Sequence, residues 1–459
     1  MRLSFHGAAR SVTGSLHALE VGGAVVFLEC GLFQGRRAEA ANRNREFPFP
    51  PKEVAAVLLS HAHIDHSGNL PGLVRAGFRG TIHATTPTVD LAEVMLRDSG
   101  RIQESDAEFL RRKRKEKVEP LYTSEDVEET LPKFAGRRYG EWFDVAGGVR
   151  ARFHDAGHIL GSAFVEIEAS ENGSSRRIVF TGDFGREGMP ILRDPVPLPP
   201  ADVVITESTY GNRDHPPLPD MERDLAEALN ACARGCGRVV IPAFSVGRTQ
   251  NLIYTLHRLY RDGLVPNLPI VVDSPMSTRA TRVVAAHPEV FDEEARAVLA
   301  EEGSPFFFRG VRYVESVEDS KRLNDEKGPL VIVSASGMCE FGRILHHLKR
   351  ALPDPASLVL IVGYQAENTL GRRLVEGAKT AKIFGDEIDV RARVLSMDGW
   401  SAHADRAGLL AGLAPLAKGA RSAFVVHGES DAADALAGSL RDAGYRRVEV
   451  PARGASFAI

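Results

Sequence analysis

The densest group of chemistry-bearing residues in this 459-residue sequence is the run HAHIDH at 61–66. The apolar run AAVLLS (55–60) before it reads as a strand, and a helical pattern begins near Gly68. A strand-to-helix turn can direct several side chains to one point, whereas a straight strand sends alternate residues to opposite faces. Imidazole and carboxylate suit zinc, so the turn is predicted to supply half of a two-metal site. Its candidate ligands are His61, His63, Asp65 and His66.

Three further candidate ligands stand where strand-like runs end. His158 follows the run ARFHD, Asp183 lies in TGDFG, and His427 lies in VVHGE. A polar residue beside glycine at a strand end is also a common turn former, so each one taken singly has a structural interpretation. Neighbouring glycines, however, let the backbone approach a ligand closely. We therefore predict that these three residues complete the site.

Two textures divide the chain. Up to about residue 205, short strand-like runs alternate with turns. From about 208, apolar strands at 238–244, 268–274, 329–336 and 357–364 alternate with helical patterns near 218–234, 247–262, 277–300, 316–326 and 342–350. That alternation is typical of a parallel sheet covered on both faces. The predicted domains are 1–207, an inserted α/β domain at 208–395, and a return segment of the first domain at 396–459.

Composition places few limits on function. Hydrophobic residues make up 43% of the chain, charged residues 26%, and the net charge is -4, so a nucleic-acid partner would need a local basic patch. The run RRKRKEK (111–117) is either a solvated helix face or a contact for a phosphate backbone. The sequence shows no signal peptide or membrane span, and its four cysteines are scattered. A cytoplasmic location and no membrane partner are therefore expected.

Taken together, the motifs resemble those of the metallo-β-lactamase superfamily, and specifically its β-CASP branch of nucleic-acid-processing enzymes. Within that branch, the chain resembles the bacterial and archaeal relatives of the cleavage and polyadenylation specificity endonuclease subunit. The motifs are HAHIDH, GHILGS, TGDFG, TEST at 206–209, SAHAD at 401–405 and VVHGE, in the family's order over essentially the whole chain. The resemblance implies an α/β fold, a metallo-β-lactamase αββα sandwich with an inserted α/β β-CASP domain.

The resemblance also assigns metal ligands for two Zn²⁺ per chain. The first zinc would be held by His61, His63 and His158, the second by Asp65, His66 and His427, with Asp183 bridging both. A carboxylate suits the bridge because each of its oxygens can take one cation; a site with one zinc is the alternative. Where the family usually has aspartate, this chain has Glu29, which is implied to support the turn through hydrogen bonds rather than bind metal.

Proton transfer is assigned in the same way. Asp65 is implied to orient the attacking water or accept its proton, and His403 in SAHAD to protonate the leaving 3′-oxygen. Glu207 in TEST is implied to be the carboxylate partner of His403, since a carboxylate beside an imidazole favours the charged form that an acid requires. Alternatively, His403 caps the helix expected near 406–413.

Substrate contacts are expected in the inserted domain. The segment SASGMCEFGRILHHLK (334–349) resembles one that meets RNA phosphates, with amides at a helix start near Gly342, although a structural turn is the alternative. The family commonly has paired glycines where this chain has Phe341 and Gly342. The predicted contacts are Ser336, Gly337, Met338, Arg248, Arg343 and Arg372.

The predicted function is therefore a zinc-dependent ribonuclease of RNA processing or decay, acting on single-stranded RNA. Endonucleolytic cleavage that leaves 5′-phosphate and 3′-hydroxyl ends is the leading interpretation. A 5′-exoribonuclease of similar chemistry and a small-molecule metallo-hydrolase of thioesters or lactones are alternatives. A DNA-processing nuclease and a non-catalytic scaffold are further alternatives. A homodimer is compatible with the sequence, which does not decide the oligomeric state.

Overall fold

The computed structural model describes residues 1–114, 118–235, 237–363, 365–366, 368–397 and 399–459. They divide into two units. The sandwich unit comprises Met1–Glu187, Asp194–Asp214 and His403–Ile459, and the inserted unit comprises Gly188–Arg193 and His215–Ala402. The domain boundaries after residues 207 and 395 remain predictions. Residues 115–117, the end of the basic run noted above, lie outside the described residues.

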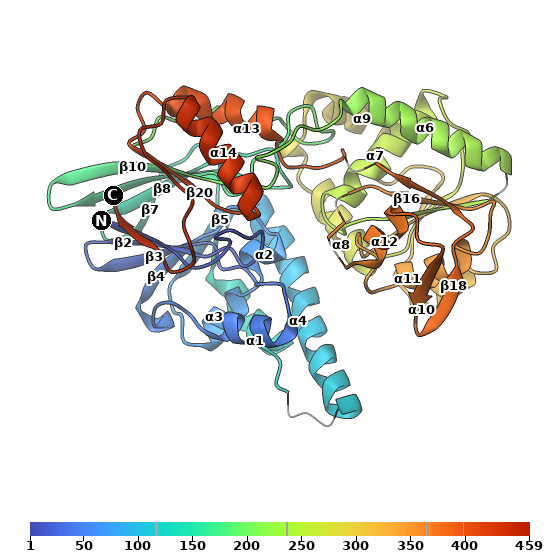
Figure 1. Cartoon of the computed structure of the whole chain (residues 1–459), viewed down its shortest axis with the longest axis horizontal. Coiled ribbons are helices and arrows are strands. Elements are labelled where there is room, and N and C mark those ends of the chain that lie inside the picture. The colour runs from blue at the N-terminus through green and yellow to red at the C-terminus, as the bar shows by residue number, and fades with distance from the viewer. Residues whose placement is uncertain (115–117, 236, 364, 367, 398) are drawn as a thin grey trace. The chain divides into compact units, whose positions relative to one another are not determined.

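Two β-sheets form the centre of the sandwich unit, with seven described strands each (Figure 1). In order, the first sheet contains β22 (Ser456–Ala458), β1 (Arg2–Phe5), β2 (His17–Val21), β3 (Ala24–Leu28), β4 (Val54–Leu58), β5 (Thr81–Thr85) and β6 (Phe134–Arg137). The second contains β21 (Val448–Glu449), β20 (Ser422–Val425), β11 (Val203–Thr206), β10 (Ser174–Phe180), β9 (Ala163–Glu171), β8 (Val149–Asp155) and β7 (Phe143–Ala146).

Apolar side chains fill the space between these sheets. Phe5 and Val26 of the first sheet share one buried cluster with Phe153, Ile178 and Phe424 of the second. The rings of Phe5 and Phe424 lie 5.1 Å apart. Each buried aromatic or branched side chain contributes about 1.5–3 kcal/mol relative to exposure, so the two sheets are held firmly face to face.

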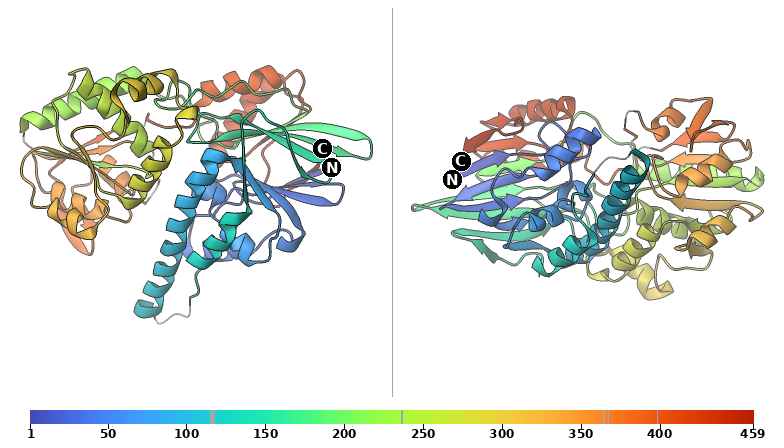
Figure 2. Two further views of the ribbon diagram at one scale, coloured as in Figure 1. Left: turned by 180° about the vertical axis from the view of Figure 1, so that it is seen from behind. Right: turned by 90° about the horizontal axis from the view of Figure 1, so that it is seen from below.

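Helices cover the outer faces of both sheets (Figures 1 and 2). Five helices follow strands of the first sheet along the chain: α1 (Arg37–Arg45), α2 (Ile64–Ser67), α3 (Leu70–Arg75), α4 (Thr86–Arg114) and α5 (Ser124–Thr130). Two helices flank β20 of the second sheet along the chain: α13 (Arg406–Leu413) and α14 (Ser430–Asp442). Leu70 packs in one cluster with Phe27 and Val57, and Leu436 in another with Val204. The predicted αββα sandwich is confirmed.

The inserted unit is built on a parallel sheet that has six strands in the described chain. Their order is β14 (Val311–Tyr313), β13 (Ile270–Val272), β15 (Leu330–Ser334), β12 (Arg238–Pro242), β16 (Leu358–Ile361) and β19 (Arg393–Ser396). The helices are α6 (Leu218–Gly235), α7 (Arg248–Arg261), α8 (Pro275–Ala285), α9 (Glu293–Glu302), α10 (Val317–Arg322), α11 (Ile344–Ala351) and α12 (Leu370–Val375). The predicted inserted α/β fold is therefore confirmed.

Two details of the inserted unit differ from the sequence prediction. The helix predicted over 277–300 is two helices, because Pro288 begins a separate short turn and the Asp292 side chain caps α9 by accepting the Ala295 N–H at 2.6 Å. The hairpin of β17 (Thr380–Ile383) and β18 (Asp386–Asp389) was not predicted. Strand β18 is DEID, whose acidic, largely exposed residues do not form a strand-like pattern.

A buried charge network stabilises the inserted unit. Asp273, which follows β13, is completely buried. Its Oδ1 accepts a hydrogen bond from Arg343 Nη1 at 2.7 Å, and its Oδ2 lies 2.6 Å from both His347 Nε2 and Ser320 Oγ. Burial raises the pKa of Asp273, but hydrogen bonds from these three residues outweigh it and hold the pKa below its usual value. One carboxylate therefore joins β13 to α10 and α11.

We expect Asp273→Asn to lower the free energy of unfolding by about 3 kcal/mol, because removing one buried charge leaves its partners uncompensated. The folded-state pKa is depressed, so the carboxylate stabilises fully above the ordinary Asp pKa of about 3.9, and this stabilisation is lost as the pH falls further. Urea denaturation at neutral and acidic pH measures both effects. The exposed Asp325→Asn is the control; an Asp273 variant as stable as the wild type at pH 7 would contradict the assignment.

No helix in the described chain combines the length and the apolar character needed to cross a lipid bilayer.

Candidate metal centre

The predicted metal ligands lie at one edge of the sandwich unit because of strand direction. Strands β10, β11 and β20 are parallel neighbours, and Asp183, Glu207 and His427 follow their carboxyl ends. Strand β8 precedes His158 and points the same way as β10, since each is antiparallel to β9. Residues far apart in sequence are thereby brought to a common edge.

The HAHIDH turn after β4 is fixed by backbone contacts with two segments, one before β2 and one after β3. Cys30 N–H donates to His66 O at 2.8 Å, and Ser15 N–H donates to Asp65 O at 2.8 Å. Gly31 lies so close to the turn that a β-carbon there would be 1.6 Å from Asp65 O. Only glycine fits at this approach, so the turn and its side chains are held rigidly.

The first group of ligand atoms comprises His61, His63, His158 and Asp183, all within 4.8 Å of one another. His63 Nδ1 lies 3.1 Å from His61 Nε2 and 3.3 Å from His158 Nε2. Asp183 Oδ2 lies 3.4 Å from His61 Nε2. Two nitrogens bound to a tetrahedral zinc at about 2.0–2.1 Å are themselves about 3.4 Å apart, so these atoms fit one zinc without rearrangement.

The second group comprises Asp65, His66 and His427. His66 Nε2 lies 3.1 Å from His427 Nε2, which lies 3.4 Å from Asp65 Oδ2. Asp183 directs Oδ1 toward this group, 3.3 Å from His66 Nε2. That oxygen is buried and has no hydrogen-bond partner among the described residues. This buried oxygen faces the rings of His66 and His427 and is placed to take a cation, so the site suits a second metal that Asp183 would share with the first group.

Burial and neighbouring charges set the charge states of these groups. Burial lowers the pKa of His61 to about 3 and that of His63 to about 4, so both rings are neutral at pH 7. Burial raises the pKa of Asp183, but the surrounding histidines, His427 first among them, outweigh it and hold the pKa well below its usual range. Neutral imidazoles and an ionised carboxylate are the forms that bind zinc. In the second group, burial lowers the pKa of His66, but carboxylates, Asp183 first among them, outweigh it and raise the pKa well above its usual value, so this ring must lose a proton to bind zinc.

Glu29 contacts the second group, where its predicted role is to support the ligands. Its side chain is completely buried, Oε1 accepts the Ser60 N–H at 2.7 Å, and Oε2 lies 3.2 Å from His66 Nδ1. A ring whose Nδ1–H is held by a carboxylate presents Nε2 to a metal. Glu29 also adopts a φ of 68°, so a strained backbone accompanies the longer side chain at this position.

His403 and Glu207 form a pair beside the metal ligands. Glu207 is completely buried, and its Oε1 lies 3.0 Å from His403 Nδ1 and accepts the Phe184 N–H at 2.6 Å. Burial lowers the pKa of His403, but Glu207 and then Asp183 outweigh it and raise the pKa to about 9. The cap of α13 is Asp405, which accepts the Gly408 N–H, so the alternative interpretation of His403 as that cap is wrong.

One side of the centre is open to solvent. The side chains of Asp65 and His403 are 26% and 19% exposed, whereas that of Asp183 is 2% exposed. The side chains of His66 and His427 are 1% and 6% exposed. Asp65 and His403, the two residues predicted to transfer protons, therefore lie on the solvent-exposed side of the centre.

The predicted substrate-binding segment of the inserted unit forms a closed loop after β15. Ser336 N–H donates to Phe341 O at 3.3 Å, Gly337 O accepts from Gln365 Nε2 at 3.0 Å, and Met338 O accepts from the Gly371 N–H at 3.2 Å. These contacts order the loop. The RNA contacts of Ser336, Gly337 and Met338 remain predictions.

The three predicted arginine contacts differ in their surroundings. Arg343 donates to Asp273 Oδ1, to Val314 O and to Glu315 O, so its guanidinium is engaged in the buried network. Arg372 Nε donates to Glu376 at 2.6 Å. Arg248 is the first residue of α7. Phosphate binding by Arg248, Arg343 and Arg372 remains a prediction, and for Arg343 it would require breaking internal hydrogen bonds.

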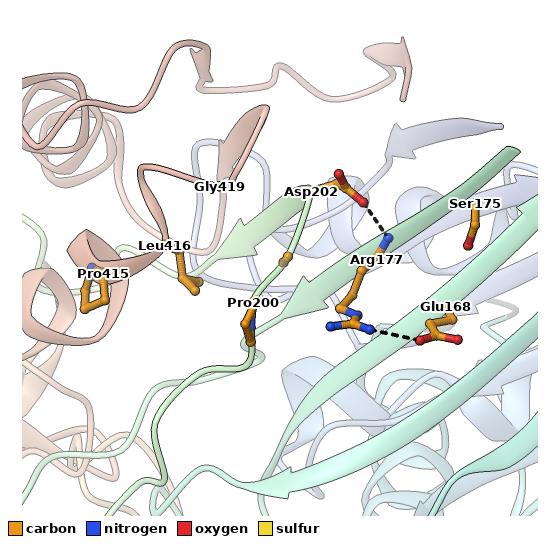
Figure 3. A pocket seen from close by; sticks show the side chains of 9 residues that line it. Glu168, Ser175, Arg177, Pro200, Asp202, Pro415, Leu416 and Gly419 are labelled. Atoms are coloured by element: carbon orange, nitrogen blue, oxygen red, sulfur yellow. Dashed lines mark hydrogen bonds and ion pairs between the residues drawn. The ribbon is translucent and has the colours of Figure 1, made fainter.

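A separate cavity of about 460 Å³ lies at the other end of β10 (Figure 3). Arg177 donates its backbone N–H to Asp202 Oδ2 at 3.0 Å, and its guanidinium Nη2 donates to Glu168 Oε1 at 3.2 Å, so the side-chain charge is paired with Glu168. The cavity is lined by Glu168, Ser175, Arg177, Pro200, Ala201, Asp202, Pro415, Leu416 and Gly419, with no histidine or cysteine among these described residues. It lacks the metal-binding chemistry of the His- and Asp-rich centre.

Two supporting residues were missed at the sequence level. Ser60 Oγ lies 2.9 Å from His61 Nδ1, and Thr209 Oγ1 lies 3.3 Å from His427 Nδ1. Ser60 directly precedes the HAHIDH run, and Thr209 is the last residue of TEST; these positions are the signal that could have found them. Hydroxyl residues are common in turns, so position alone would not have separated a supporting contact from an ordinary turn.

Family models match three successive parts of the chain: the metallo-β-lactamase superfamily at residues 18–220, the Beta-Casp domain at 249–374, and the Zn-dependent metallo-hydrolase RNA specificity domain at 387–451. Over 438 residues the chain is 41% identical to a ribonuclease of Thermus thermophilus, and the match covers 94% of each protein. The chain belongs to the β-CASP branch of the metallo-β-lactamase superfamily. It is accordingly a metal-dependent hydrolase, as predicted.

Two other similar proteins are more distant. The chain is 31% identical over 466 residues to the transcription termination factor FttA of Methanocaldococcus jannaschii, covering 98% of this chain and 70% of FttA. A solved structure of a protein of unknown function from Enterococcus faecalis V583 matches with a TM-score of 0.57 and 14% identity, covering 100% of this chain and 99% of that one. This second likeness shows a shared fold.

We expect Glu29→Gln to weaken zinc binding by about 10–100-fold, the usual effect of removing a partner of a metal ligand. The Ser60 N–H and His66 Nδ1 face different oxygens of Glu29, and glutamine replaces one of these two acceptors by an NH2 group, which donates. Competition with a chromogenic chelator measures the affinity, and circular dichroism checks the fold. The exposed Glu53→Gln is the matched control, and unchanged zinc affinity in Glu29→Gln would refute the supporting role.

Proposed function

We propose that this chain is a ribonuclease that uses two zinc ions to cut single-stranded RNA internally, leaving 5′-phosphate and 3′-hydroxyl ends. The observation that carries the proposal is the Glu207–His403 pair on the open side of the metal centre, with His403 Nε2 3.9 Å from Asp183 Oδ2. The ribonuclease among the relatives and the match to an RNA specificity domain support RNA as the substrate.

Two cations suit the donor atoms present, since Asp183 directs one oxygen to each group of ligands. When bound, two zinc ions supply a water that ionises near neutral pH and stabilise negative charge at phosphorus. The first would be held by His61, His63 and His158, the second by Asp65, His66 and His427, with Asp183 shared between them.

The chain's own residues move the protons. Asp65 is more exposed than Asp183, the other carboxylate among the ligands. It orients the attacking water and accepts its proton. His403 is protonated and delivers the Nε2 proton to the leaving 3′-oxygen as the P–O3′ bond breaks. Glu207 Oε1 faces His403 Nδ1 and so keeps Nε2 directed at the centre. The new P–O bond to water yields the 5′-phosphate, and the protonated oxygen becomes the 3′-hydroxyl.

The main alternatives use the same centre. A 5′-exoribonuclease would share every residue named above and differ in recognising a 5′ end. A small-molecule esterase would need the zinc ligands but has less need of a separate acid, because an activated ester or thioester expels a better leaving group than an alkoxide. The Glu207–His403 pair therefore favours phosphodiester hydrolysis.

The test incubates zinc-loaded protein with end-labelled single-stranded RNA and with DNA of the same sequence. We expect internal cuts in RNA alone, and a loss of about 10²–10⁴-fold in the rate for His403→Ala, the usual contribution of a general acid. Zinc content should be unchanged in this variant. His154→Ala, which removes a partly exposed histidine of β8 outside the metal centre and the predicted RNA contacts, is the matched control and should cleave at the wild-type rate.

Other outcomes are informative in different ways. Mononucleotides released from the 5′ end would retain the chemistry and replace internal cleavage by exonucleolytic cleavage. A His403→Ala protein as active as the wild type would remove His403 from the mechanism. A protein that binds two zinc ions and cuts neither nucleic acid would leave the small-molecule hydrolase as the better account.

A further inference from the structure

The segment after β11 is joined closely to the segment after β20. Ser208 N–H donates to His427 O at 3.1 Å, and Ser208 Oγ donates to Val426 O at 2.8 Å. The two backbones are so close that a β-carbon on Gly428 would lie 2.2 Å from Ser208 Oγ. His427 itself has a φ of 46°, in the left-handed region. Its conformation therefore depends on contacts with the neighbouring segment.

The side chain of Thr209 contacts His427 twice. Its Oγ1 lies 3.2 Å from His427 O and 3.3 Å from His427 Nδ1. A hydroxyl has one hydrogen to donate and lone pairs to accept. When it donates to the carbonyl oxygen, it accepts from the protonated Nδ1. Both contacts are satisfied together in only one tautomer, with Nε2 unprotonated.

The opposite ring nitrogen faces the second group of ligand atoms. His427 Nε2 lies 3.1 Å from His66 Nε2 and 3.4 Å from Asp65 Oδ2. Asp183 Oδ1 lies 3.4 Å from His427 Nδ1, but it forms no hydrogen bond within the described chain. Thr209 is therefore the hydrogen-bonding partner of Nδ1 in this geometry.

We propose that Thr209 is a positioning residue for the second zinc, which orients His427 and fixes the tautomer that presents Nε2 to the metal. The inference rests on the proposed two-zinc centre and gives a role there to Thr209, the last residue of the TEST motif. Metal-binding histidines commonly donate their other N–H to such a partner, and the partner tunes metal affinity.

Thr209 also contacts the acid pair, through a different part of the residue. Its backbone N–H donates to Glu207 Oε2 at 3.2 Å, while Glu207 Oε1 faces His403 Nδ1. A side-chain substitution removes the hydroxyl and keeps the amide. Loss of the hydroxyl should therefore affect the second zinc and leave the acid pair in place, which separates positioning of the metal from general damage.

The experiment compares Thr209→Val, which keeps the shape and removes the hydroxyl, with Thr209→Ser, which keeps the hydroxyl. Zinc is titrated into metal-free protein against a chromogenic chelator, so that the two binding steps are resolved without any assay of RNA cleavage. We expect Thr209→Val to weaken one of the two steps by about 10–100-fold and Thr209→Ser to bind nearly as the wild type does. Thr380→Val, at an exposed position of β17, is the control.

Three results would contradict the role of Thr209, and each can be told apart from the others. A wild type with two zinc ions and a Thr209→Val variant with both affinities unchanged would overturn the role of Thr209 and leave the proposed function standing. Equal weakening of both steps, together with a lower melting temperature, would show a general structural role and overturn it as well. A wild type that binds one zinc would overturn both this inference and the two-zinc proposal.

Discussion

The fold around the site depends on how the Asp183 carboxylate is satisfied. Asp183 is buried between two groups of imidazoles, with Oδ2 toward His61 and Oδ1 toward His66. A buried anion needs compensating charge. His66 and His403 supply part of it, because carboxylates that include Asp183 outweigh burial and raise their pKa values. Burial keeps His61 and His63 neutral. Cations are the compensation that fits the distances and the ligand types. Metal binding and the stability of this edge of the sandwich therefore depend on the same balance of charge around Asp183.

Strand direction solves the problem of bringing the groups together. The parallel strands β10, β11 and β20 place Asp183, Glu207 and His427 at their carboxyl ends, and the sandwich core holds the strands in register. The acid pair adds a further constraint, because Glu207 and His403 are separated by 196 positions and the inserted unit lies between them in sequence. The pair exists only when the chain returns to the sandwich after the insertion.

Much of the fold and of the candidate site could be predicted from the sequence, for physical reasons. The HAHIDH turn and the parallel strands of the insertion could be predicted because ligand spacing and apolar runs are local. The partners of these groups could not: Ser60 and Thr209 act through hydrogen bonds that depend on three-dimensional placement. Arg343 was predicted to contact phosphate from its loop position, whereas the structure engages it with Asp273. The split between α8 and α9 was missed because helical periodicity continues across Pro288.

The most direct test of the two-metal account is anomalous X-ray diffraction from crystals of the zinc-loaded protein, measured on both sides of the zinc absorption edge. Two peaks about 3.5–4 Å apart are predicted, one among His61, His63 and His158 and the other among Asp65, His66 and His427, with Asp183 between them. A single peak, or peaks away from these residues, would contradict the central claim.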